Sequence, residues 1–237
     1  MPARWIESRN ARLALLAMLA ASAICVGMHG ARSWIFGEAK HSSLIGNLLL
    51  AWIPLLFALP VYALSRTPGR RLTLAGCTLV WFLFYPNAPY LVTDLVHLKT
   101  RPPVPRWYDL ILIMSYAWTG LSLGYFSLYL MQEVVRRRLG RGMGWCFAIV
   151  MLALGSFGVF VGRQWRWNSW EVLTNPLGLA GKAADKMDGM TPREMTVFCT
   201  MFFAFSLLIY ITLYALTHLH GWTERTSEKL AHPCTKD

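Results

Sequence analysis

Long apolar runs alternate with short polar or basic connections along most of this chain. The pattern predicts six membrane-spanning helices, at residues 13–31, 44–65, 72–91, 109–132, 145–162 and 192–218. Each run is long enough to cross a bilayer, because roughly 20 helical residues span the hydrocarbon core. We therefore expect an all-α integral membrane protein, with the 237 residues forming a single transmembrane domain.

The start of the last helix is the best marked. Thr191 is a suitable N-cap, Pro192 stands at the first helical position, and Glu194 completes a capping box. These residues predict a helix that begins at Pro192.

The third run contains the stretch "WFLFYPNAPYLVTDLVHL" at residues 81–98, which begins apolar and then turns polar. Pro86 and Pro89 each lack a backbone N–H and disfavour helix in the preceding residue. We therefore expect the third helix to break near its outer end. Carbonyl groups freed at that depth must be met by protein or water, since lipid offers no donors.

Beyond the break, the polar residues keep α-helical spacing. Tyr90, Asp94 and His97 stand at positions i, i+4 and i+7, with apolar residues on the other sides. This spacing predicts one polar stripe on a short, otherwise apolar helix. Asn87 lies roughly 22 Å along the helix from residue 72, just inside the outer leaflet.

Composition agrees with a membrane location, since 55% of the residues are hydrophobic and 15% are charged. The net charge of +11 is compatible with nucleic-acid binding. However, the basic residues cluster between apolar runs, as in "RTPGRR" and "VVRRRLGRG", where they orient membrane helices. We therefore expect no nucleic-acid partner.

The basic clusters also predict the orientation. Cytoplasmic loops carry an excess of Lys and Arg, which places the tails at residues 1–12 and 219–237 in the cytoplasm and the 163–191 connection outside. We expect a multi-pass protein of the inner (cytoplasmic) membrane. The "ASA" sequence at residues 21–23 resembles a signal-peptidase site, but the apolar run continues past it and favours a retained first helix.

This topology brings polar groups from three distant stretches to one membrane level on the outer side. The candidate catalytic residues are Asp94 and His97. The candidate residues for an anion or headgroup are Arg163, Arg166, Asn168, Asn87, Tyr90 and Asn47. An arginine fork binds phosphate or carboxylate; ordinary snorkelling of both arginines to phospholipid headgroups is an equal alternative.

The connection after the fifth helix is rich in tryptophan. Trp165, Trp167 and Trp170 can stack on a sugar, but we favour an aromatic belt on a short interfacial helix between helices five and six. Asn168 and Ser169 then act as N-caps of that helix.

Metal and haem sites have few candidate ligands in the sequence. Asp94 and His97 can supply two metal ligands, with Glu171, His29 or His41 as a third, but we favour an ion pair of Asp94 with Arg163 or Arg166. We predict no metal site. No two histidines face one another at mid-span to hold haem, and the five cysteines show no CxxC spacing.

Small residues are spaced for close helix contact. Gly120 and Gly124, and likewise Gly158 and Gly162, form GxxxG patterns. Such faces serve packing within a bundle or the formation of an oligomer, and we favour the former.

The segments "NLLLAWIPLLFAL", "FYPNAPYLVTDLVHL" and "GRQWRWNSWEVLTNP" resemble those of a bacterial multi-pass membrane family known as domain of unknown function 1361. The resemblance runs from about residue 44 into the sixth helix. It implies the membrane architecture and carries no activity, cofactor or residue role.

Three functions are compatible with the sequence. We favour an enzyme or binder whose outer-facing polar pocket holds a lipid-linked or anionic headgroup. A small transporter or channel lined by the broken helix is the second, and a structural or assembly protein without catalysis is the third. The pattern leaves catalysis open and implies no particular cofactor. The expected partners are membrane lipids and a lipid-linked ligand.

Overall fold

The computed structural model describes residues 9–37, 42–65, 67–98, 103–165 and 192–218. It confirms the predicted all-α class. The helices are α2 (Arg9–Phe36), α3 (Ser42–Leu64), α4 (Arg71–Phe84), α5 (Asn87–Tyr90), the 3₁₀ helix η1 (Leu91–His97), α6 (Arg106–Leu139), α7 (Arg141–Phe160), the π-helical turn η2 (Val161–Trp165) and α10 (Pro192–His218).

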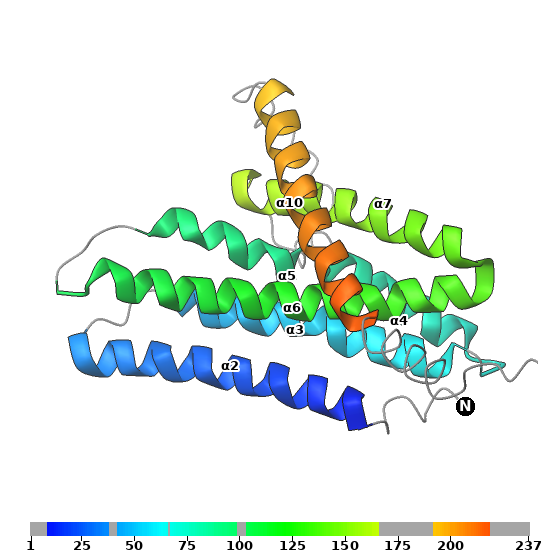
Figure 1. Cartoon of the computed structure of the whole chain (residues 1–237), viewed down its shortest axis with the longest axis horizontal. Coiled ribbons are helices and arrows are strands. Elements are labelled where there is room, and N and C mark those ends of the chain that lie inside the picture. Colours follow the sequence, from blue (N-terminus) through cyan, green and yellow to red (C-terminus); the bar gives the residue numbers. More distant parts are fainter. Residues whose placement is uncertain (1–8, 38–41, 66, 99–102, 166–191, 219–237) are drawn as a thin grey trace, which may run out of the picture.

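Five of these helices, α2, α3, α6, α7 and α10, are long and apolar enough to cross a membrane. The third predicted helix is made of two pieces, α4 and the α5–η1 segment, which follow one another along the same direction (Figure 1). Helices α2, α3, α6 and α7 run along the long axis of the molecule, whereas α10 crosses them at a steep angle (Figure 1). Helix α6 is central, since it contacts α2, α3, α5, η1 and α7.

The predicted break in the third helix is present, but α4 ends at Phe84, earlier than the predicted residue 91. Pro86 and Pro89 have no N–H to offer the carbonyls one turn earlier. The N–H of Ala88 therefore bonds the Tyr85 carbonyl at 3.3 Å, and the Asn87 side chain bonds the Phe84 carbonyl at 3.1 Å. The residues around the break thus supply the donors that lipid cannot.

Other predicted boundaries were too narrow or lie outside the described residues. Helix α6 extends from Arg106 to Leu139, well beyond the predicted 109–132. The sixth helix begins and ends as predicted, at Pro192 and His218. The interfacial helix predicted between helices five and six lies outside the described residues.

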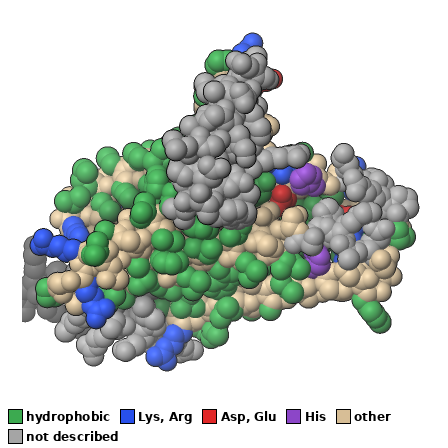
Figure 2. Space-filling view, turned by 180° about the vertical axis from the view of Figure 1, so that it is seen from behind, with side chains coloured by type: hydrophobic (Ala, Val, Ile, Leu, Met, Phe, Trp, Pro, Cys, Tyr) green, Lys and Arg blue, Asp and Glu red, His purple; other side chains and the backbone are tan. Residues whose placement is uncertain are grey.

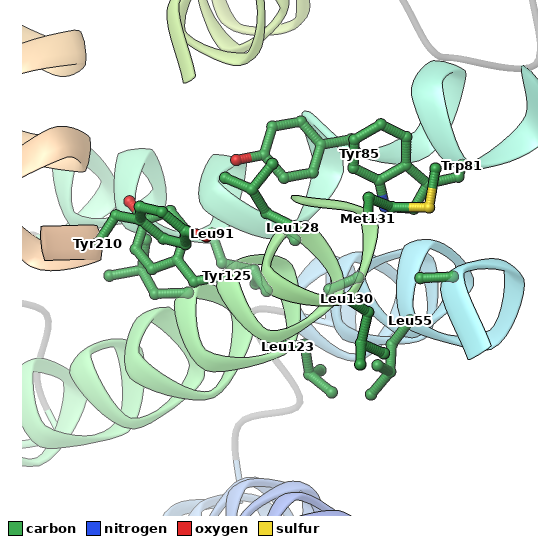
Figure 3. Close-up of a cluster of buried hydrophobic side chains, with 14 of the residues drawn as sticks. Leu55, Trp81, Tyr85, Leu91, Leu123, Tyr125, Leu128, Leu130, Met131 and Tyr210 are labelled. Carbon is green, nitrogen blue, oxygen red and sulfur yellow. The ribbon is translucent and has the colours of Figure 1, made fainter. Parts of the chain in front are cut away.

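The core is built where α4 meets α6 and α7. Trp81 is fully buried, and its indole N–H donates to Ser127 Oγ of α6 at 3.1 Å. Its ring stacks on Phe147 of α7 with the centroids 5.9 Å apart. Figure 3 shows Trp81 and Tyr85 above Leu128 and Met131 of α6. This cluster joins α4 to two long helices, α6 and α7.

The break segment (residues 85–91) lies against glycines of two helices. A Cβ on Gly120 of α6 would stand 2.5 Å from Leu91 Cδ1 and 2.7 Å from the Ala88 carbonyl oxygen. On α7, a Cβ on Gly155 would stand 2.7 Å from Tyr85 and one on Gly158 would stand 2.5 Å from Pro86. Gly120 and Gly158 of the predicted GxxxG patterns therefore pack within this chain, as the bundle alternative predicted.

The absence of a Cβ at Gly120 is therefore a requirement for packing. We expect Gly120→Ala to destabilise the protein by about 1–3 kcal/mol, because the added methyl overlaps backbone as well as side-chain atoms. Gly76→Ala is the matched control, since a Cβ on that α4 glycine meets nothing within 4 Å. Equilibrium unfolding in mixed micelles measures both; equal stability of the two variants would contradict the packing argument.

Candidate functional site

Asp94 is the centre of the polar cluster at the end of the bundle where α5 and η1 lie, which we call the site end. Because η1 is a 3₁₀ helix, side chains three positions apart share one row. Asp94 therefore lines up with Leu91 and His97, and the predicted α-helical stripe through Tyr90 is wrong. Asp94 is 5% exposed, whereas His97, one turn further on, is exposed to the surroundings.

Three elements meet at the Asp94 carboxylate. Asn47 of α3 donates from Nδ2 to Asp94 Oδ2 at 3.1 Å. Arg163 of η2 approaches Asp94 Oδ1 with one terminal guanidinium nitrogen at 3.5 Å. The predicted convergence of the three stretches is thus present in the structure, and so is the favoured ion pair between Asp94 and Arg163.

Local backbone geometry explains how Arg163 reaches this position. Helix α7 ends at Phe160 and continues as the π-helical turn η2, which widens the last turn. Arg163 lies in that turn with its side chain 16% exposed. It therefore stands between the buried carboxylate and the surface of the site end.

The remaining predicted site residues are placed as follows. Asn87 is half-buried and uses its amide to bond the Phe84 carbonyl. Tyr90 is half-buried, and its carbonyl accepts from Thr93 Oγ1 at 2.7 Å. Trp165 is the last residue of η2. Arg166, Trp167, Asn168 and Trp170 lie outside the described residues.

A second buried ion pair at the same end was missed in the sequence analysis. Arg32 of α2 donates from Nε to Asp109 Oδ1 of α6 at 2.7 Å and from Nη2 to Oδ2 at 3.4 Å. The two residues are 2% and 4% exposed. Their fork geometry joins the C-terminal end of α2 to the N-terminal end of α6. The signal in the sequence was an arginine just after the predicted first helix and an aspartate at the start of the predicted fourth helix, which alternating helix direction places at one level.

Further polar groups line the α2–α6 contact. Cys25 Sγ lies 3.4 Å from Thr119 Oγ1, and the Tyr108 hydroxyl donates to the Met28 carbonyl at 2.8 Å. His29 packs edge-on to Tyr116 with ring centroids 6.5 Å apart. Within the described residues, no three His, Cys, Asp or Glu side chains are grouped to hold a metal ion.

The opposite end, which we call the basic end, carries Arg71, Arg136, Arg137, Arg138 and Arg141. Figure 2 shows basic side chains at both ends of the molecule and hydrophobic ones over much of the surface between. Glu133 accepts from Arg136 Nε at 2.6 Å and from Arg137 Nε at 2.7 Å. Arg137 also lies over the Tyr62 ring, 4.5 Å from its centroid.

Residues 47–211 match the model of a family described as "Protein of unknown function (DUF1361)". The chain belongs to this family. The match includes Asn47, Asp94, His97 and Arg163, and it leaves out Arg32 and the first helix. Comparison with curated proteins and with solved structures finds no match to this DUF1361 protein.

The Arg32–Asp109 pair is expected to be a major determinant of stability in this DUF1361 protein. Asp109→Asn should cost about 3–5 kcal/mol, because it removes the charge that compensates a buried guanidinium. Replacing both residues, by Arg32→Met with Asp109→Leu, should recover most of that loss. Unfolding in mixed micelles measures all of these variants.

The comparison variant is Arg136→Gln. The ion pair of Arg136 with Glu133 is partly exposed, so we expect this variant to lower the free energy of unfolding by less than about 1 kcal/mol. If Asp109→Asn is no more costly than Arg136→Gln, the buried pair contributes little and the argument from burial fails.

Proposed function

We propose that the site end binds the phosphate or carboxylate headgroup of an amphiphilic ligand, with Arg163 as the anion-binding residue. The observation that carries the proposal is the contrast between two arginines. Arg32 holds Asp109 through two nitrogens, whereas Arg163 holds Asp94 through one nitrogen at 3.5 Å. Among the described residues, the other donors of Arg163 make no hydrogen bond, so its fork is available for an anion.

Asp94 has a positioning role in this proposal. Asn47 orients the carboxylate from α3, and the carboxylate in turn holds the guanidinium of Arg163 at the surface. A buried, hydrogen-bonded carboxylate keeps the guanidinium in place without occupying both edges of its fork. Arg166, three residues further along the chain, is the proposed second cation that offsets the charge of Asp94.

His97 is the proposed acid–base group if the bound ligand is also processed. It follows Asp94 by three residues in η1, so both side chains point from the same row, and His97 is the exposed one of the two. An exposed imidazole beside a bound anion can donate or accept a proton. Binding is the primary proposal, and catalysis by His97 depends on it.

A purely structural role is the second candidate, and the same cluster favours it. Asn47, Asp94 and Arg163 come from α3, η1 and η2, so their contacts also hold three elements together. Under this alternative, the cluster stabilises the protein and binds no ligand.

The variant Arg163→Lys separates the two functions. Lysine keeps the positive charge near Asp94 but lacks the planar fork that grips a phosphate through two N–H groups. We expect Arg163→Lys to retain wild-type stability and to bind a polyprenyl phosphate about tenfold more weakly. Native mass spectrometry of the detergent-solubilised full chain, titrated with the polyprenyl phosphate, measures the bound fraction.

Two controls complete this test. The uncharged polyprenol reports binding by the apolar chain alone. Arg106→Gln removes an exposed arginine from the site end without touching Asp94, and it should bind like the wild type. If the wild type does not distinguish the phosphate from the alcohol, and Arg163→Gln lowers only the stability, the structural role is correct.

A further inference from the structure

A cleft opens at the basic end of the bundle, opposite the Asp94 cluster. It has a volume of about 1040 Å³ and lies between α4 on one side and the ends of α3, α6 and α7 on the other. A second, smaller groove of about 550 Å³ lies between α2, α6 and α10, lined largely by tyrosines and apolar side chains. The larger cleft is distinguished by the charged residues in its lining.

The path of α4 explains why the cleft exists. Helix α4 packs chiefly against α3, and its last turns reach α6 and α7 through Trp81. Towards its first turn, α4 is separated from the end of α6 by the cleft, and Leu72 is exposed there. The cleft therefore lies at the basic end, and the buried Trp81 ring is part of its lining.

The rim of the cleft is cationic. Arg71, the first residue of α4, and Arg138, in the last turn of α6, both line it, and none of its described lining residues is acidic. Arg138 donates to the carbonyl of Ser65, another lining residue, at the end of α3. Ser65 and Thr67 add hydroxyl groups at the same level. The rim therefore favours an anion with several oxygen acceptors.

Below the rim, the lining becomes apolar. Phe82, Phe147 and Met151 line it, as does the buried Trp81. The distance along α4 from Arg71 to Trp81 is about 15 Å at 1.5 Å per residue. This is half the roughly 30 Å hydrocarbon core of a bilayer, so the cleft has the depth of one leaflet.

We propose that this cleft binds an anionic phospholipid, with the phosphate between Arg71 and Arg138 and an acyl chain reaching down to Trp81. Charge, depth and the change from a polar rim to an apolar lining all match a lipid of the leaflet at the basic end. The positive-inside orientation makes this the cytoplasmic leaflet, whose surface carries anionic lipids. The site is separate from the headgroup site proposed at Asp94 and does not depend on it.

The experiment uses delipidated full-length protein and two probes with identical acyl chains, phosphatidylglycerol and phosphatidylcholine. Native mass spectrometry with equimolar probes measures the occupancy of each. We expect the wild type to retain phosphatidylglycerol about tenfold more strongly, because only its headgroup has net charge. The double variant Arg71→Gln, Arg138→Gln should abolish this preference.

A second variant tests the cleft without altering its charge. Ala75 lines the cleft, so Ala75→Phe fills it and should lower phosphatidylglycerol occupancy about tenfold. Gly76→Phe is the matched control, because the neighbouring residue does not line the cleft and has open space around it. Circular dichroism establishes whether each variant is folded. If the double arginine variant is unfolded, the phosphatidylglycerol occupancy of Ala75→Phe tests the proposal instead.

Two results would overturn the proposal. One is equal retention of both lipids by the wild type, which would make the cleft a general acyl groove. The other is unchanged phosphatidylglycerol occupancy in folded Ala75→Phe, which would place the bound lipid elsewhere on the protein.

Discussion

The structure depends on how one membrane pass is broken without exposing its backbone to lipid. Pro86 and Pro89 remove two donors from the third pass, and an unmet carbonyl in hydrocarbon costs several kcal/mol. Asn87 and the N–H of Ala88 meet two of the carbonyls at the break. Glycines of α6 and α7 then admit the break segment into the interior, away from lipid. The prolines of the broken pass and the glycines of α6 and α7 therefore act together: the prolines break the helix, and the glycines make room for the break.

The break in the third pass positions both proposed sites. Beyond the break, the chain continues as the 3₁₀ helix that presents Asp94 to Asn47 and Arg163. Before the break, Trp81 fixes the end of α4 against α6 and α7, and the start of α4 departs from them to form the cleft. A single irregular pass thus creates a polar cluster at one end of the bundle and an amphiphilic cleft at the other.

The two buried ion pairs at the site end have different geometries and suit different roles. Arg32 and Asp109 satisfy one another through a fork and join α2 to α6, which is the geometry of a structural pair. Arg163 makes one longer contact with Asp94 from a partly exposed position. Since an arginine engaged on one side retains donors for a second anion, the looser pair is the one suited to a ligand.

The sequence by itself determined the architecture of this DUF1361 protein, the break at Pro86 and the start of the last helix. Those features follow from local chemistry: apolar run length, missing proline donors and capping residues act on their own segment. The sequence also indicated that Asn47, Asp94 and Arg163 share one level, because alternating helix direction sets depth. Only the tertiary structure decided that η1 is a 3₁₀ helix, that Arg32 pairs with Asp109, and that α4 departs from α6. Those outcomes depend on which helix faces meet and how closely, and the spacing of residues along one chain does not encode that contact.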